Sequence, residues 1–133
     1  NYIFSRGLNC KTTTQFNTNE WLIASDVLFT VFSNAGYDQI IFNRLSKKPL
    51  GVVIYALFDL ELSNWFTKTY GMEELPFIKK GLAHCVKHYQ GLKDTIEKCL
   101  TNEVRLDIWK RIQKNVQPPG FTTDKIFHIL SNE

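Results

Sequence analysis

The segment from residue 50 to residue 70 constrains the fold most, because apolar side chains run through it without a turn signal. Its first part, 52–58, is rich in β-branched and aromatic residues, which is the composition of a strand. The length of the whole segment favours a helix, since buried strands usually have about four to eight residues. We therefore predict one helix that ends at Gly71, and a strand over 52–58 is the alternative.

Helical spacing of apolar residues predicts further helices on both sides of this segment. Asn17 followed by Glu20 has the pattern of a capping box, so a buried helix is expected from residue 17 to residue 34. Gly36 suits the left-handed position after its end. The other expected helices cover 38–46, 73–90, 92–100, a stretch from 102 capped by Thr101, and a last one after the loop at 118–120.

These elements predict an all-α protein: a compact single-domain bundle of six or seven helices with short loops. The helical domain spans 17–133, and residues 1–16 form an irregular N-terminal arm. A length of 133 residues suits one domain. Intrinsic disorder is excluded because 44% of the residues are hydrophobic and the net charge is only +3.

The location of the protein is inferred from its cysteines and its hydropathy. The chain has 3 cysteines, an odd number that does not suit a secreted disulfide scaffold. Its apolar runs are shorter than the ~20 residues that cross a bilayer. We expect an intracellular protein, cytoplasmic or nuclear, without membrane contact. The first residue is Asn1, so we also expect the chain to be part of a longer or processed protein.

Residue patterns that would carry catalysis or bind a metal are weak. His84 and His88 lie four residues apart, and Cys85 beside them could be a third zinc ligand. However, Cys85 falls on an apolar stripe, where cysteine behaves as a small hydrophobe. Asp59, within the most hydrophobic segment, is a candidate general acid that lacks a second carboxylate or histidine beside it. We expect no enzyme activity, no metal and no cofactor.

Aromatic residues give the clearest indication of function. They make up 14% of the chain, and several of them bracket Gly71. Tryptophan and tyrosine are enriched at the energetic centres of protein interfaces. We therefore expect a non-catalytic protein–protein interaction module within a larger intracellular protein, and we do not expect a small-molecule ligand. The expected contact residues are Trp65, Phe66, Tyr70, Phe77 and Trp109.

A nucleic-acid partner is the alternative, because nine Lys or Arg but only four Asp or Glu lie between residues 79 and 114. Basic side chains on neighbouring helices can contact phosphates. The alternative site consists of Lys79, Lys80, Lys87, Lys110, Arg111 and Lys114. Acidic residues at helical spacing can neutralise such a face, as Asp107 can for Arg111. This interleaving favours the protein partner over the nucleic acid.

Overall fold

The computed structural model describes residues 17–120, which form a mixed α/β fold. Three strands, β1 (Val27–Thr30), β2 (Val52–Ala56) and β3 (His84–Val86), pair in parallel in the order β1-β2-β3. The prediction of an all-α helical bundle is therefore wrong. The expected arm at 1–16 and the expected last helix after the 118–120 loop lie outside the described residues.

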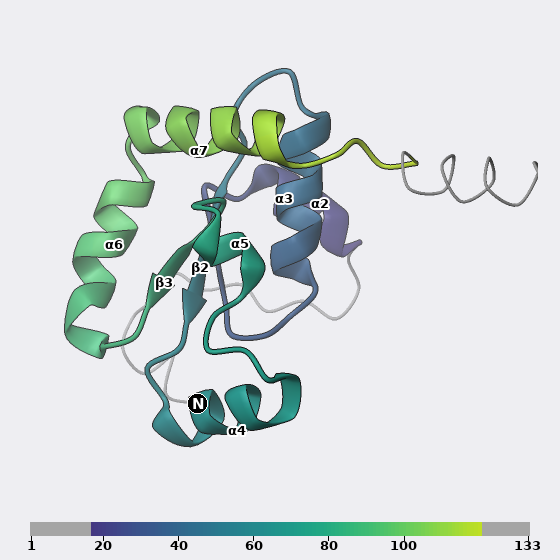
Figure 1. Cartoon of the computed structure of the whole chain (residues 1–133). Helices are drawn as coiled ribbons and strands as arrows, with labels where there is room; N and C mark the ends of the chain where they lie inside the picture. The colour runs from purple at the N-terminus through teal and green to yellow at the C-terminus, as the bar shows by residue number, and fades with distance from the viewer. Residues whose placement is uncertain (1–16, 121–133) are drawn as a thin grey trace, which may run out of the picture.

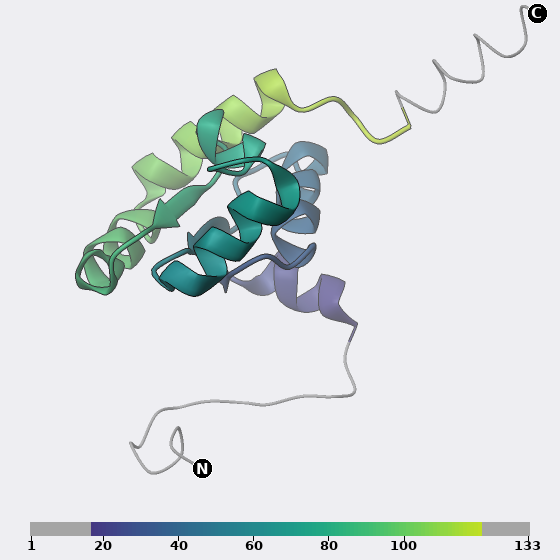
Figure 2. The ribbon, with the colours of Figure 1, turned by 60° about the horizontal axis from the view of Figure 1, so that its bottom comes forward.

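Helices surround this small sheet (Figure 1). They are α2 (Thr18–Ala24), α3 (Ala35–Leu45), α4 (Leu60–Tyr70), α5 (Pro76–Lys79), the 3₁₀ helix η1 (Tyr89–Gly91), α6 (Leu92–Cys99) and α7 (Asn102–Asn115). The strands lie between α3 and α6, with α7 across one end and α4 near the other. Figure 2 brings α4 to the front, and Figure 1 shows α7 at the opposite end of the sheet from α4.

The most hydrophobic segment forms strand β2 followed by helix α4, so the prediction of one helix there is wrong. All five residues of β2 are buried, as expected for the central strand of a parallel sheet that is covered on both faces. Such a strand is a continuous apolar run without polar alternation. Only residues 57–59 separate it from α4, and none of them is Gly or Pro. The strand alternative over 52–58 is thus the correct one for β2.

Asp59 marks the point at which α4 begins. Its side chain accepts a hydrogen bond from the backbone N–H of Leu62 at 3.0 Å, which caps the helix. Asp59 is exposed to solvent, so it is not the buried candidate acid that the sequence suggested. At the other end of α4, Gly71 adopts the left-handed conformation (φ 65°), as the sequence predicts.

The helix expected over residues 17–34 is two elements instead of one. Asn17 does cap α2, where its side chain accepts from the N–H of Asn19 at 3.1 Å. The chain then leaves the helix after Ala24 and forms β1. Gly36 does not end a helix but lies buried in the first turn of α3. A Cβ atom there would overlap the hydroxyl of Tyr55, so glycine permits this close approach.

The helix expected over residues 73–90 is also wrong. The α-helix there is the short α5, and the chain turns at Gly81 in the left-handed region (φ 65°) before it enters β3 and then η1. The later helices α6 and α7 agree with the sequence. Thr101 caps α7 by accepting from the N–H of Val104 at 3.4 Å, and the apolar stripe buries Ile108 and Ile112.

Side-chain hydrogen bonds join α3 to its neighbours at the end where the strands begin. The Gly51 carbonyl before β2 accepts from Gln39 at 3.2 Å and from Asn43 at 2.9 Å. On the α7 side, Arg44 donates to the Val116 carbonyl at 2.7 Å. Trp109 donates to the Ser46 hydroxyl at 3.2 Å, so its indole helps to attach α7 to α3.

Within residues 17–120, no helix is both long and apolar enough to cross a membrane.

Candidate functional site

A hollow lined mostly by aromatic side chains lies where β1 and β2 end. We call it the aromatic hollow, and its volume is about 240 Å³. Its lining residues are Phe32, Ser33, Asn34, Tyr37, Tyr55, Phe66, Tyr70, Met72, Leu75 and Phe77. In open parallel sheets, ligands typically bind outside the carboxyl ends of the strands, which is the position of this hollow.

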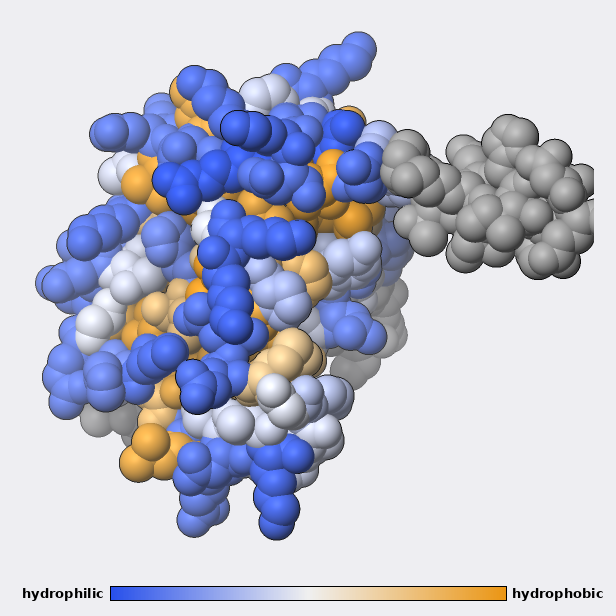
Figure 3. All heavy atoms as spheres, in the orientation of Figure 1, coloured by the Kyte–Doolittle hydropathy of each residue, from blue (hydrophilic) through white to orange (hydrophobic). Residues whose placement is uncertain are grey.

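The sequence-predicted contact residues separate into three groups. Phe66, Tyr70 and Phe77 line the aromatic hollow, and Trp65 lies next to it, with its ring 6.0 Å from that of Tyr70. Trp109 lies elsewhere, on α7, in contact with Ser46. In Figure 3, white and tan atoms gather between α5 and α4 on the face that the figure presents. The structure therefore brings four of the five predicted residues together.

The rings of this group have different surroundings. Phe66 is only 4% exposed and stacks on Phe32, with ring centres 4.5 Å apart and planes 4° apart. Trp65 and Tyr70 are 51% and 55% exposed. Phe66 is thus part of the packing beneath the hollow. Among these predicted residues, the rings most open to a partner are those of Trp65 and Tyr70 at the rim of the hollow.

The aromatic hollow contains a hydroxyl that sequence reasoning missed. Tyr55 on β2 is 2% exposed, and its hydroxyl lies against Gly36 at the first turn of α3. It makes no hydrogen bond to any residue between 17 and 120. Burial raises the pKa of Tyr55, so the phenol remains a protonated donor at neutral pH. Ser33 on the same lining accepts from the N–H of Ala35 at 3.2 Å.

The histidine and cysteine candidates line a second hollow, of about 630 Å³, between β3 and α7. Burial lowers the pKa of His84, assisted by the positive charges of Lys98 and Arg111 and opposed by Asp107. Burial also raises the pKa of the Cys85 thiol, which therefore stays protonated. No hydrogen bond joins His84, Cys85 and His88. These are not the features of an activated nucleophile.

Metal binding and the remaining cysteines give no further site in the described part of the chain. No group of three His, Cys, Asp or Glu residues there could hold a metal ion. Cys99 is fully buried, and that burial raises its pKa to about 11. Cys10 and His128, the remaining cysteine and histidine of the chain, lie outside the described residues.

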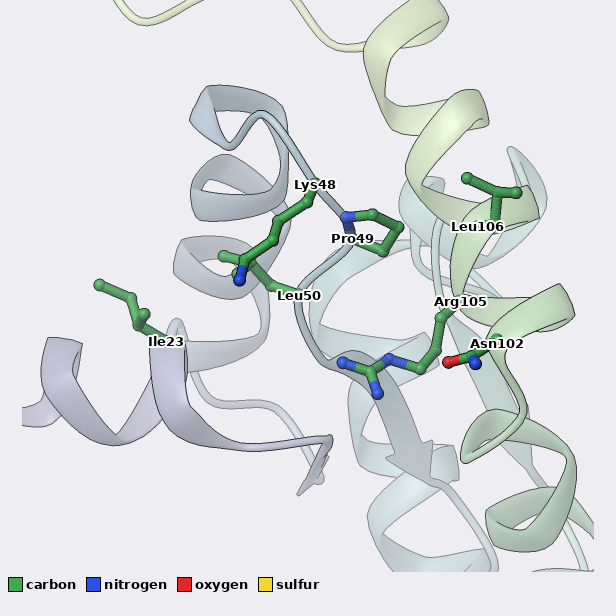
Figure 4. A pocket seen from close by; sticks show the side chains of 7 residues that line it. All are labelled: Ile23, Lys48, Pro49, Leu50, Asn102, Arg105 and Leu106. Atoms are coloured by element: carbon green, nitrogen blue, oxygen red, sulfur yellow. The ribbon is translucent and has the colours of Figure 1, made fainter.

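A third hollow, of about 500 Å³, lies between the first turn of α7 and the chain that leads into β2 (Figure 4). Lys48, Pro49 and Leu50 form one side, and Arg105 extends toward them from α7. The Arg105 guanidinium already forms an ion pair with Asp26 at 3.0 Å. The sequence did not predict this juxtaposition of Lys48 and Arg105, because only the folded chain brings them together.

The basic residues of the alternative site are partly neutralised. Arg111 pairs with Asp107 at 2.8 Å, and Lys87 approaches Glu74 at 3.9 Å. Hydrophilic atoms cover α7 in Figure 3. The other four residues, Lys79, Lys80, Lys110 and Lys114, are exposed and make no ion pair with a described residue.

Comparisons with protein families, with curated proteins and with solved structures each gave no match. The chemistry of the hollows is therefore the basis for assigning a function.

Proposed function

We propose that this domain is a protein-interaction module that receives one apolar side chain of a partner protein in the aromatic hollow. The observation that carries the proposal is the combination of a small hollow and accessible rings at its rim. Its volume of about 240 Å³ is below the roughly 300–1,000 Å³ of typical small-molecule pockets. A space of this size suits a single anchoring side chain.

The exposed rings supply the surface that would surround such an anchor. Trp65 and Tyr70 are about half exposed, and their ring centres are 6.0 Å apart. Large aromatic side chains at the centre of an interface contribute most of its binding energy, provided that neighbouring contacts exclude water. An intracellular location is part of the proposal, and the free thiols Cys85 and Cys99 support it.

A nucleic-acid partner is the second candidate. The observation in its favour is the set of four exposed lysines without ion-pair partners among residues 17–120, two at the end of α5 and two on α7. The acidic partners of Lys87 and Arg111 count against it, because they reduce the positive field along the same surface.

The test is selection of a displayed random-peptide library on the whole chain. We expect the enriched peptides to share an aromatic anchor and to bind the Tyr70→Ala variant at least tenfold more weakly. Tyr89→Ala is the matched control, because Tyr89 is 70% exposed but does not line the aromatic hollow. The proposal is wrong if no peptide is enriched, or if Tyr70→Ala binds the enriched peptides as tightly as the wild type does.

A further inference from the structure

We infer that the side chain received by the aromatic hollow is a tyrosine of the partner, whose hydroxyl accepts a hydrogen bond from Tyr55. This inference rests on the proposed function and adds the chemistry of the anchor. It starts from Tyr55, which lines the hollow and whose hydroxyl has no hydrogen-bond partner among the described residues.

The hydroxyl of Tyr55 offers a hydrogen-bond donor to an occupant of the hollow. A hydroxyl that an occupant shields from water without pairing it costs about 1–3 kcal/mol. Tyr55 is 2% exposed and lines the hollow, yet it has no hydrogen-bond partner among the described residues. An occupant with an acceptor at its tip would take the place of water at this donor, whereas a purely apolar occupant would leave the donor unpaired and bind more weakly.

The charge of the hollow restricts that acceptor. Among the described residues, no Lys or Arg lines the hollow, so a carboxylate or phosphate placed there would lose its hydration without gaining a counter-charge. The N-terminal end of α3 faces the same site, but its Ala35 and Gly36 N–H groups already bond to Ser33. The tip of the occupant is therefore neutral.

The walls of the hollow determine the rest of the occupant. Rings of Phe32, Phe66 and Phe77 form much of the lining, which favours a flat apolar body. A flat ring that ends in one neutral oxygen is the tyrosine side chain. Its hydroxyl can accept from Tyr55 and donate to Ser33, whereas the indole N–H of tryptophan only donates.

We assign the tyrosine to a partner protein, and not to a free phenolic compound, because the apolar surface continues beyond the hollow. Trp65 and Tyr70 at the rim can cover the residues next to the anchor in a partner chain. A free phenolic compound would leave these rings exposed to water. The same chemistry in a small molecule is therefore an outcome that the experiment must separate.

The experiment measures affinities of four probes by NMR titration of the whole chain, in the wild type and in Tyr55→Phe. The probes are N-acetyl-tyrosinamide, N-acetyl-phenylalaninamide, N-acetyl-phosphotyrosinamide and p-cresol. One added hydrogen bond predicts that the wild type binds the tyrosine probe about tenfold more tightly than the phenylalanine probe. In Tyr55→Phe this ratio should fall to about one, and in both proteins the phosphotyrosine probe should bind most weakly.

Each outcome bears on a different claim. Equal binding of the tyrosine and phenylalanine probes by the wild type overturns the inference and leaves an apolar anchor as proposed. Absence of any shift at the hollow with all four probes overturns the proposed function as well. Binding of p-cresol as tight as that of the tyrosine probe would show that a free phenol suffices. If Tyr55→Phe fails to fold, the ratio of the two probes on the wild type decides.

Discussion

The two ends of the sheet differ in how much charge they carry. At the end where the strands begin, α7 is rich in charge, but Arg105 pairs with Asp26 and Arg111 pairs with Asp107. At the end where β1 and β2 finish, no charged residue of the described chain lines the aromatic hollow, and the Tyr55 hydroxyl has no partner among residues 17–120. The comparison teaches that the density of charge is a poor guide to a binding site. A hydrogen-bond donor that lies in an apolar setting and lacks a protein partner has more to gain from a ligand than a charge that is already paired.

The largest expected effect is a difference in stability between alanine variants of two adjacent residues that lie at or beside the aromatic hollow. Phe66→Ala removes a buried ring that stacks on Phe32, and it should lower the free energy of unfolding by about 3–5 kcal/mol. Trp65→Ala is the matched control, since its half-exposed ring should cost less stability while weakening peptide binding. Urea denaturation checks the difference. Equal losses of stability would contradict the division into a buried ring and a rim.

Gly36 should be the next most sensitive position. A Cβ atom in Gly36→Ala overlaps the Tyr55 hydroxyl, so the tyrosine ring must shift, at a cost of about 1–3 kcal/mol. The same shift should weaken binding of the tyrosine probe. Gly91→Ala is the control, because a Cβ there meets nothing within 4 Å. Equal melting temperatures for the two variants would contradict the close packing of Tyr55 against Gly36.

A pH effect should come from the charged end. The pKa of His84 is lowered in the folded state, so the unfolded chain binds the proton more readily. Stability from this group is therefore complete above the unfolded-state pKa of about 6.5, and it is lost as the pH falls toward the lower folded-state value. His84→Gln should flatten the stability profile in this range. An unchanged profile in the variant would assign the acid sensitivity to other groups.

The ion pair of Arg111 with Asp107 should contribute little, because both side chains are about half exposed. Asp107→Asn is expected to cost about 0.2–1 kcal/mol, an effect that salt should remove. Urea denaturation at low and at high ionic strength measures it. A loss that is larger, or that persists at high salt, would show that this ion pair is better shielded from water than its exposure indicates.

Charge reversal at Lys110 and Arg111 should have the smallest effect on the proposed activity. We expect the double variant Lys110→Glu with Arg111→Glu to bind the enriched peptides as the wild type does, because neither residue lines the aromatic hollow. A nucleic-acid partner predicts instead a filter-binding signal that falls steeply with salt and that this variant loses. Observing that signal would favour the second candidate function.

Features that depend on neighbouring residues in the sequence could be predicted, whereas features that depend on contacts between distant segments could not. Caps and glycine ends are local, so Asn17, Thr101 and Gly71 were recognised correctly. The apolar stripe of α7 is also local. A central parallel strand such as β2 has no polar alternation, and β3 has only three residues, so neither could be distinguished from helix by periodicity.

The candidate site shows the same limit. The rings around Gly71 are close in sequence, and the sequence indicated them as a group. Phe32, Gly36 and Tyr55 meet only because β1, α3 and β2 form one crossover, which the predicted bundle did not contain. Gly36 was a visible signal, but a glycine after a helical pattern fits an end cap equally well.

The most direct single measurement is a map of the backbone amide shifts that N-acetyl-tyrosinamide causes in the wild-type chain. Perturbed amides should cluster at the residues that line the aromatic hollow, among them Phe32, Tyr55 and Phe77, and those of α7 should stay in place. Shifts confined to α7 and its lysines, or no shift at saturating probe, would contradict the assignment of binding to the aromatic end of the sheet.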